Sequence, residues 1–474
     1  MTEFKSDPKT KSRSIFFIIE KSYKYLIWIY LVALLLIHFR RIFDNCFWAD
    51  EIFSIEAAKG NFANSVYVSS HDNHPPFYYL LLNLVTKLLG DKSWVYHFSS
   101  FLAYALLLIE CVTLIRKKIG TATAFIVMTL SSFLYSSMTY IVEVRMYEWG
   151  AFFVLSAAVF LCLIMRDNQK IWYILYLIAT VLGAYTHYYC FLTIIYLYIG
   201  LIIWGIVKKG EILKRVIIIS CSAILLYAPW FVTLFKTLSN NKETSWMTGY
   251  PRILDCLKYL FDGKAWLLLW MCFLGGMIFY FIRNKMNGDS VFIIIAFLSV
   301  TCTVFTGILV SIIDHPVLLT RYLYPCSTIC WLILGLLIQN IFAENYVYDD
   351  LLGVAISLII GAWFFPYYLY VYDSEKAQDA AMQQTVDEVN AIRDDETVFV
   401  VAGDQCPGLC RYYFDLDETI TLNGMTDKTK NYVLFVDENE DTELKEYVEQ
   451  NDMISVLSNM YMGTARYSIY KYEP

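Results

Sequence analysis

Acidic and histidine side chains are concentrated in one polar stretch, residues 48–79, of a chain that is otherwise strongly apolar. The stretch contains the neighbouring carboxylates Asp50 and Glu51, followed later by Asp72 and His74. A carboxylate can act as a general base that takes the proton from a hydroxyl group. We therefore predict that this stretch, with its neighbouring carboxylates Asp50 and Glu51, forms half of an active site.

A divalent metal ion is an alternative that the stretch leaves open, with Asp50 and His74 as the candidate ligands. Two histidines, His71 and His74, and scattered carboxylates do not define a metal site by themselves. The Pro75-Pro76 pair fixes an extended turn in either case, because proline locks its own backbone and restricts the residue before it.

Further polar clusters lie beside other apolar runs. They are Glu143–Tyr147, Thr186–Tyr189, Asp314-His315 and Arg321-Tyr322. Arginine stays charged and offers a fork of N–H donors that fits a phosphate group, so Arg145 and Arg321 are candidate phosphate ligands. For Arg145 the alternative is an ion pair with Glu143 or Glu148. For Arg321 the alternative is contact with lipid headgroups.

We predict that a substrate contacts seven of these side chains. They are Asp72, His74, Arg145, Tyr147, His187, Arg321 and Tyr322. His187 has a plainer alternative as a hydrogen-bonded histidine at the membrane surface. The tyrosines beside it have the alternative of interfacial aromatic residues, which are common at membrane boundaries.

Composition indicates the elements that must position these residues. The chain is 58% hydrophobic and 17% charged, against about 25% charged in soluble domains. Apolar runs long enough to cross a bilayer predict an α-helical polytopic membrane protein with about eleven spans. These are Tyr25–Phe43, Trp94–Ile115, Thr121–Ile141, Tyr147–Met165, Ile171–Tyr185, Cys190–Val207, Val216–Leu234, Trp266–Ile282, Val291–Ile313, Tyr324–Phe342 and Leu351–Tyr372. The net charge of −7 without a basic stripe does not suggest nucleic-acid binding.

Lys and Arg set the expected orientation in a multi-pass plasma membrane. With residues 1–24 as a basic cytoplasmic tail, the inner segments hold 17 Lys and Arg in 58 residues, and the short outer segments hold 12 in 104. This bias is the one expected for cytoplasmic loops. Arg40 and Arg41 break the pattern, and we expect them to extend toward lipid headgroups. Residues 44–93 then form the first extracytoplasmic loop, in which Phe77–Leu89 is too short to span and is predicted to be interfacial or re-entrant.

The C-terminal region, residues 373–474, is polar and is predicted to be a small extracytoplasmic α/β domain that follows a transmembrane domain of residues 25–372. Three segments have the pattern of strands and two that of helices. They are the strands Thr397–Ala402, Tyr432–Asp437 and Ala465–Tyr472, and the helices Gln378–Asp394 and Thr442–Glu449. Cys406 and Cys410 are expected to be a disulfide or free thiols in preference to metal ligands.

The acidic pair Asp50-Glu51, followed by the motif Asp72-Asn73-His74-Pro75-Pro76, resembles the acidic pair and D-x-H-P-P motif of protein O-mannosyltransferases. It also resembles the first loop of bacterial aminoarabinose transferases. Both belong to the GT-C superfamily of multi-span glycosyltransferases, and Glu143–Tyr147 and Arg321-Tyr322 resemble blocks of bacterial members. The chain differs from the O-mannosyltransferases at Phe77–Tyr79, where they have Gly-Lys, and it lacks their large inserted luminal domain.

The resemblance implies an extracytoplasmic active site, a polyprenyl-phosphate-linked sugar donor and inversion at the anomeric carbon. It implies that Asp50 is the general base, with Glu51 tuning or positioning it. The acceptor would be a cell-envelope glycan, a lipid or a protein. A transporter or lipid flippase is the alternative, but such proteins carry midplane charges and inverted repeats with broken helices, which the sequence does not display. A membrane scaffold for the C-terminal domain would not require the acidic loop.

Overall fold

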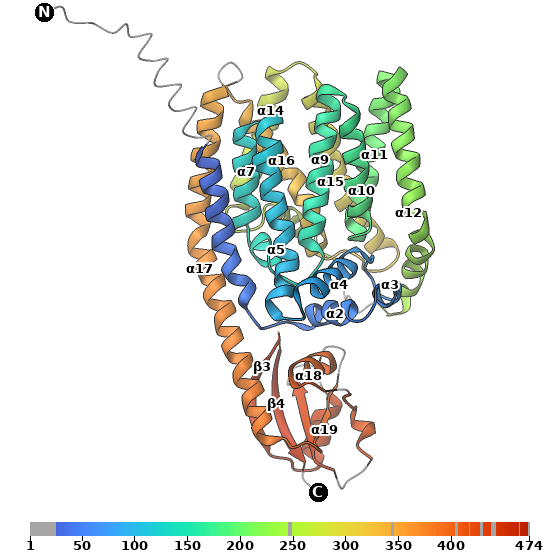
Figure 1. The fold of residues 1–474 in the computed structure, drawn as a ribbon, viewed down its shortest axis with the longest axis vertical. Coiled ribbons are helices and arrows are strands. Elements are labelled where there is room, and N and C mark those ends of the chain that lie inside the picture. Colours follow the sequence, from blue (N-terminus) through green and yellow to red (C-terminus); the bar gives the residue numbers. More distant parts are fainter. Residues whose placement is uncertain are drawn as a thin grey trace, which may run out of the picture.

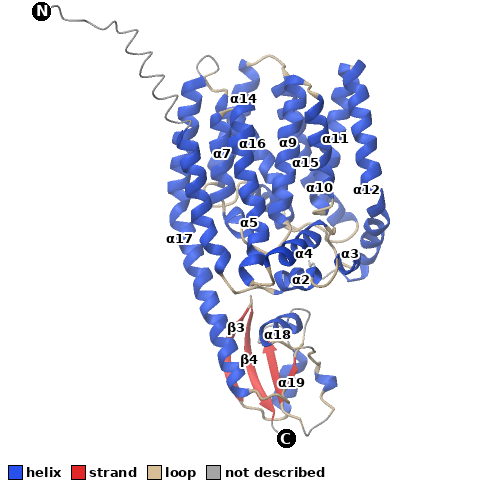
Figure 2. Ribbon diagram, in the orientation of Figure 1, coloured by secondary structure: helices blue, strands red, loops and turns tan. Residues whose placement is uncertain are grey.

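A bundle of long helices carries a small α/β domain at one of its ends (Figure 1). The structure is a computed structural model that describes residues 25–244, 249–342, 346–402, 406–416, 418–426, 430–437, 442–463 and 465–472. The predicted basic tail, residues 1–24, lies outside the described residues. Almost all of the bundle is helical, and the strands are confined to the α/β domain (Figure 2).

Nine helices of the described residues are long and apolar enough to cross a membrane, and each coincides with one of the eleven predicted spans. They include the N-terminal span Tyr25–Phe43, which ends in the 3₁₀ turn η1 (Arg40–Phe43), and α5 (Ser93–Glu110), which runs on through the π-turn η2 (Cys111–Ile115) and α6 (Arg116–Lys118). The others are α9 (Tyr147–Asp167), α11 (Tyr188–Lys208), α12 (Gly210–Thr244), α14 (Trp266–Arg283), α15 (Gly288–Ile313), α16 (Tyr324–Gln339) with the preceding turn η3 (Thr320–Leu323), and α17 (Tyr346–Ile392).

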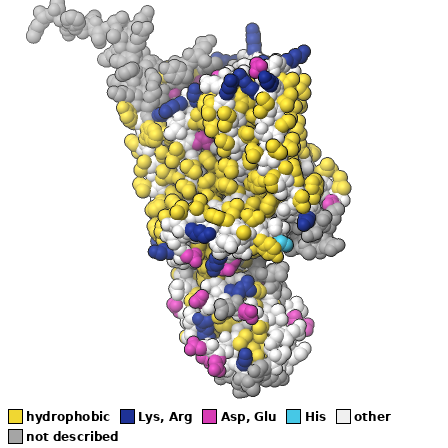
Figure 3. Space-filling model, turned by 45° about the vertical axis from the view of Figure 1, so that its right-hand side comes forward, with side chains coloured by type: hydrophobic (Ala, Val, Ile, Leu, Met, Phe, Trp, Pro, Cys, Tyr) yellow, Lys and Arg dark blue, Asp and Glu magenta, His cyan; other side chains and the backbone are white. Residues whose placement is uncertain are grey.

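The remaining two predicted spans are helices of fewer residues. The predicted span 121–141 is wrong at its end, because Leu134 adopts an extended conformation and divides the segment into α7 (Thr121–Phe133) and α8 (Tyr135–Tyr140). The predicted span 171–185 corresponds to α10 (Lys170–Ala184). Hydrophobic side chains cover the face of the bundle seen in Figure 3, and Lys and Arg side chains gather at the end opposite the α/β domain.

The predicted first loop is largely helical. It contains α2 (Ala49–Ala58), α3 (Phe62–Ser70) and α4 (Phe77–Leu89). These three helices lie together at the end of the bundle that faces the α/β domain (Figure 1). Helix α4 begins directly after the proline pair and packs on α2, α3 and α5, in agreement with the prediction that it is not a span.

The last span and the predicted helix 378–394 form one continuous helix, α17. The sequence predicted two separate helices, because the apolar pattern ends near residue 372 and a polar amphipathic pattern replaces it. The structure joins them, so α17 extends from the bundle into the α/β domain (Figure 1). The predicted domain division at residue 373 falls within this helix and stays a prediction.

The α/β domain contains one four-stranded sheet with the order β1-β2-β4-β3. Its strands are β1 (Val398–Val400), β2 (Tyr432–Asp437), β3 (Ser455–Met462) and β4 (Ala465–Tyr472). Strand β1 is parallel to β2, and β4 is antiparallel to both β2 and β3. The sequence prediction missed β3, whose two register shifts against β4 interrupt the alternation that reveals a strand.

Two helices and one 3₁₀ turn complete the α/β domain. They are α18 (Cys406–Phe414), α19 (Thr442–Gln450) and η4 (Leu422–Gly424). Helix α19 was predicted, and α18 was not. Cys406 and Cys410 lie one turn apart on α18 as buried free thiols, with their sulfur atoms 3.8 Å apart.

Two of the predicted site residues, Arg145 and Arg321, lie just before buried helices. Helices α9 and α16 are the most deeply buried of the long helices, and each follows directly on a polar turn at the end of the bundle near α2. Arg145 precedes α9, and Arg321 lies in η3 just before α16. The packing of these two helices therefore fixes where both guanidinium groups lie.

Candidate active site

Asp50 lies between the two arginines that the sequence proposed as phosphate ligands. Its Oδ2 is 3.5 Å from Arg321 Nη2 and 3.8 Å from Arg145 Nη2. The Asp50 side chain is 31% exposed, while that of Arg145 is 4% exposed. Three segments that are far apart in sequence thus bring two cations and one accessible carboxylate together.

Arg145 is anchored to α2 rather than to the acidic residues beside it in sequence. Its Nη1 donates to the Asp50 carbonyl oxygen at 3.0 Å and to Ser54 Oγ at 3.1 Å. Burial lowers the pKa of Arg145, but Tyr79, Asp50 and other anionic or phenolic neighbours raise it, so the net pKa lies above its usual range and the group stays charged. The expected alternatives, ion pairs with Glu143 or Glu148, are not the contacts that hold it.

Both arginines keep an N–H group without a partner. Among the described residues, the Nε atoms of Arg145 and Arg321 are buried and make no hydrogen bond. Arg321 also lies over the ring of Trp48, with 5.6 Å between the guanidinium carbon and the ring centroid. Unpaired buried donors are costly, and an anionic ligand would relieve that cost.

Glu51 connects α2 to the segment that precedes α9. Its Oε1 accepts from the Val144 N–H at 2.8 Å, and its Oε2 accepts from the Trp48 N–H at 3.1 Å, which fixes the start of α2. Burial, followed by repulsion from Glu143, raises the pKa of Glu51 to about 8. Burial likewise raises the pKa of Glu143 to about 7, although Arg145 and Arg321 lower it. Glu51 therefore holds its proton at neutral pH, and Glu143 is about half protonated there.

Asp72 and His74 form a second group within the same loop. Asp72 Oδ2 accepts from the Tyr79 hydroxyl at 2.8 Å and lies 3.1 Å from His74 Nδ1. Burial raises the pKa of Asp72, but His74 and Arg145 outweigh it and bring the pKa to about 2. The His74 carbonyl oxygen accepts from Ser69 Oγ at 2.7 Å, so α3 and the start of α4 hold this turn.

Rings from three other segments, His74, Tyr322 and Tyr147, lie around His187. The His187 ring lies 5.4 Å from His74, 5.0 Å from Tyr322 and 5.6 Å from Tyr147, centroid to centroid. Burial lowers the pKa of His187 well below its usual range, and its Nδ1 accepts from the Tyr189 N–H at 3.0 Å. His187 is thus a neutral, hydrogen-bonded residue beside His74 and Tyr322.

No group of three or more His, Cys, Asp or Glu side chains with metal-ligand geometry occurs in the part of the chain that the structure describes. The two candidate ligands have separate partners. Asp50 faces two arginines, and His74 faces Asp72. A metal ion shared by Asp50 and His74 therefore finds no preformed cage.

Sequence reasoning omitted four side chains that the structure brings into the site. They are Trp48, Ser54, Tyr79 and Glu143. Tyr79 lies on the first turn of α4, seven residues after Asp72. The proline pair before it was a sequence signal that a helix begins there, which places Tyr79 near the turn that holds Asp72. Glu143 was visible in its polar cluster, but its pairing with Glu51 required the fold.

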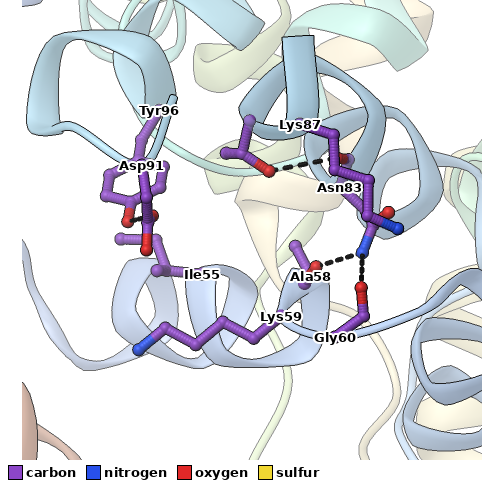
Figure 4. Close-up of a pocket in the computed structure, with 9 residues that line it drawn as sticks. Ile55, Ala58, Lys59, Gly60, Asn83, Lys87, Asp91 and Tyr96 are labelled. Atoms are coloured by element: carbon purple, nitrogen blue, oxygen red, sulfur yellow. Dashed lines mark hydrogen bonds between the residues drawn. The ribbon is translucent and has the colours of Figure 1, made fainter. Parts of the chain in front are cut away.

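A small pocket of about 200 Å³ lies at the other end of α2 and holds none of the predicted site residues (Figure 4). It is lined by Lys59, Lys87 and Asp91, among others. Asn83 of α4 donates to the carbonyl oxygens of Ala58 and Gly60 there, which ties the end of α2 to α4. This pocket belongs to the support of α2 and not to the polar cluster around Asp50.

Part of the chain matches the model of a known protein family. The family model described as dolichyl-phosphate-mannose-protein mannosyltransferase matches residues 73–235, a region that includes the His-Pro-Pro turn but not Asp50. No curated protein sequence gives a significant match.

Solved structures match over nearly the whole chain. ArnT from Cupriavidus metallidurans in the apo state has a TM-score of 0.62 at 11% identity, with 94% of this chain and 97% of that chain covered. The same protein bound to undecaprenyl phosphate gives 0.61. AglB from Archaeoglobus fulgidus, an archaeal oligosaccharyltransferase in complex with an inhibitory peptide and a dolichol-phosphate, gives 0.51 at 12% identity. Here 83% of this chain and 63% of that chain are covered.

The fold is that of the GT-C superfamily of membrane glycosyltransferases, as the resemblance predicted. Within that class the chain is similar to ArnT along almost its entire length, including the C-terminal region. At this level of identity the likeness establishes the architecture, and the chemistry depends on the site itself.

Proposed function

We propose that the protein is a membrane glycosyltransferase that moves a hexosyl or pentosyl group from a polyprenyl-phosphate donor to a hydroxyl group on the extracytoplasmic side. The acceptor is a glycan, lipid or protein of the cell envelope. The observation that carries this proposal is the position of Asp50, a partly exposed carboxylate between Arg145 and Arg321.

Asp50 acts as the general base in this proposal. Its contacts with the two arginines, at 3.5 and 3.8 Å, are longer than hydrogen bonds, so its oxygens remain able to accept an acceptor hydroxyl proton. The deprotonating hydroxyl oxygen attacks the anomeric carbon as the bond to the donor phosphate breaks, which inverts the configuration. General base catalysis of this kind contributes about 10²- to 10⁴-fold to a rate.

Arg145 and Arg321 stabilise the phosphate that leaves with the lipid. Two fixed guanidinium groups in a partly buried site favour the negative charge that develops on the leaving oxygen. Their unpaired Nε donors support this role. The structures of ArnT and AglB, which were solved with undecaprenyl phosphate and dolichol-phosphate, suggest the class of lipid phosphate.

Glu51 positions Asp50 by tying α2 to the segment before α9. Asp72, through its contacts with His74 and Tyr79, fixes the proline turn beside the site. We assign the remaining predicted residues to the wall that contacts the sugar. They are His74, Tyr147, His187 and Tyr322. A divalent metal ion is not required by this scheme, because the arginines supply the positive charge.

We place this site at the outer surface of the plasma membrane, with the N-terminus in the cytoplasm and the α/β domain outside. Two observations support that orientation. The inner segments are richer in Lys and Arg, and these side chains gather at the end of the bundle opposite the α/β domain (Figure 3).

A transfer assay with Asp50→Asn tests the proposal. Membranes that contain the protein receive a panel of radiolabelled polyprenyl-phosphate sugars, and label that leaves the donor lipid is followed into lipid, glycan and protein fractions. The expected result is a loss of transfer of at least about 100-fold at unchanged expression. Glu56→Gln is the matched control, because Glu56 is an exposed carboxylate on the same helix whose partner is Lys59. Transfer that survives in Asp50→Asn would refute the mechanism.

A further inference from the structure

The short segment between residues 41 and 48 joins the first span to α2, and the C-terminal part of the chain contacts it at three points. Glu375 and Asp379 of α17 supply two of these contacts, and Tyr413 of α18 supplies the third. Helix α18 lies against α2 (Figure 1). None of these contacts is needed to close the sheet of the α/β domain, so they raise the question of what they hold in place.

The contact from Tyr413 is a double hydrogen bond to Phe47. The Tyr413 hydroxyl accepts from the Phe47 N–H at 2.5 Å and donates to the Phe47 carbonyl oxygen at 3.1 Å. The Phe47 side chain is fully buried, with its ring stacked on His97 of α5 at 4.7 Å and 5.7 Å from the ring of Tyr412. One hydroxyl group thus fixes both backbone groups of a residue that the membrane domain and the α/β domain share.

The other two contacts restrain the same segment on its N-terminal side. Arg41 is fully buried, and its Nε donates to Glu375 Oε2 at 2.8 Å while its Nη1 donates to the Met138 carbonyl oxygen at 2.6 Å. The Asn45 N–H donates to Asp379 Oδ1 at 3.0 Å. Extension toward lipid headgroups, the expectation for Arg41, is therefore wrong, because Glu375 supplies a buried partner that a sequence pattern does not reveal.

These restraints end only three residues before Asp50. Trp48, the residue after Phe47, donates its N–H to Glu51 and lies under the guanidinium group of Arg321. A shift of the Phe47 backbone would therefore move the first turn of α2 relative to both arginines. Misplacement of reacting groups by about 1 Å can cost about 100-fold in rate.

We infer that the α/β domain is a positioning part of the active site, in which Tyr413 holds the backbone of Phe47 and thereby sets Asp50 between Arg145 and Arg321. This inference rests on the proposed function of Asp50. It gives the C-terminal domain a role in the rate of transfer and not in capture of the donor, because Tyr413 contacts the support of the base and none of the proposed phosphate ligands.

Tyr413→Phe removes the hydroxyl group and keeps the ring. We expect faster hydrogen–deuterium exchange in a peptide that covers residues 44–58, measured by mass spectrometry on the intact protein in detergent. We also expect kcat for transfer to fall by about 10- to 100-fold while KM for the lipid donor stays within about twofold. Tyr447→Phe on α19 is the matched control and should leave exchange and transfer unchanged, since Tyr447 packs in the separate small cluster of the sheet.

Two outcomes would overturn the inference. The first is faster exchange in Tyr413→Phe with wild-type kcat, which makes the contact a purely structural one. The second is unchanged exchange, which means that the hydroxyl does not restrain α2. Asp379→Ala removes the acceptor of the Asn45 N–H and provides the same readouts if Tyr413→Phe does not fold. Failure of the proposed function is recognised separately with Asp50→Asn. If that variant still transfers sugar, Asp50 is not the base, whereas the effect of Tyr413→Phe on hydrogen–deuterium exchange would still stand.

Discussion

Replacing Glu51 with Gln tests whether the carboxyl group beside the proposed base is held in its protonated form. Glu51 is buried, and Glu143 lies close enough to repel its charge, so the folded chain has a pKa of about 8 for this group where a free glutamate has 4.5. Between these two values the unfolded chain releases the proton and the folded chain keeps it. The contribution of Glu51 to wild-type stability must therefore fall as pH rises from about 4.5 to 8.

The size of the effect follows from the same two values. One pKa unit corresponds to about 1.36 kcal/mol, so full ionisation of Glu51 in the fold costs on the order of 5 kcal/mol. Gln cannot ionise and removes this term. It keeps one acceptor oxygen for the two N–H groups that contact Glu51, those of Val144 and Trp48, so it costs about 1 kcal/mol through one lost hydrogen bond. Glu51→Gln is therefore expected to be less stable than wild type at pH 5 and more stable at pH 9.

The apparent melting temperatures of wild type and Glu51→Gln in detergent, measured from pH 5 to pH 9, should therefore cross within this range. Glu56→Gln, on the exposed face of the same helix, should follow the wild-type curve, because an exposed ion pair such as that with Lys59 contributes at most about 1 kcal/mol. Parallel curves for wild type and Glu51→Gln would refute the reasoning. So would wild-type stability that rises relative to Glu51→Gln between pH 5 and pH 8, since that requires a lowered pKa of Glu51.

Two further predictions concern the frame around the site. Arg41→Met leaves Glu375 as an unpaired charge at the interface of the first span and α17. It should lower the free energy of unfolding by about 3–5 kcal/mol. The double variant Arg41→Met with Glu375→Gln should recover part of that loss, as measured in the same detergent melts. A reporter fused after Pro474 tests the orientation: alkaline phosphatase should be active there in a bacterial host and green fluorescent protein should stay dark, and the reverse pattern would contradict an outer α/β domain.

The helical framework could be predicted because its signal is local. An apolar run of about 20 residues indicates a span wherever its neighbours lie. The errors arise where the local signal stops. Leu134 divides a predicted span without any helix-breaking residue nearby, and α17 continues through residue 373, where the apolar pattern ends but the hydrogen-bonded helix does not.

The site could be predicted in part, because polar clusters at the ends of spans must meet if those ends lie on one side of the membrane. Asp50, Arg145 and Arg321 meet for this reason. Their exact partners could not be predicted from the sequence, in which Glu143 and Glu148 were the expected partners of Arg145. Tyr413 was also beyond it, because its contact with Phe47 joins residues 366 positions apart and leaves no pattern in either segment.

In the proposed mechanism, the balance of charge at Asp50 favours transfer from a lipid phosphate. Arg145 and Arg321 carry two positive charges, and burial favours the protonated forms of Glu51 and Glu143, so Asp50 is the carboxylate that both arginines face. Asp72, the other carboxylate near Arg145, is paired with His74. A sugar phosphodiester brings one negative charge, and the phosphate monoester that leaves brings up to two. In this proposal the arginines bind the departing phosphate more strongly than the intact donor, which is the difference that accelerates a reaction.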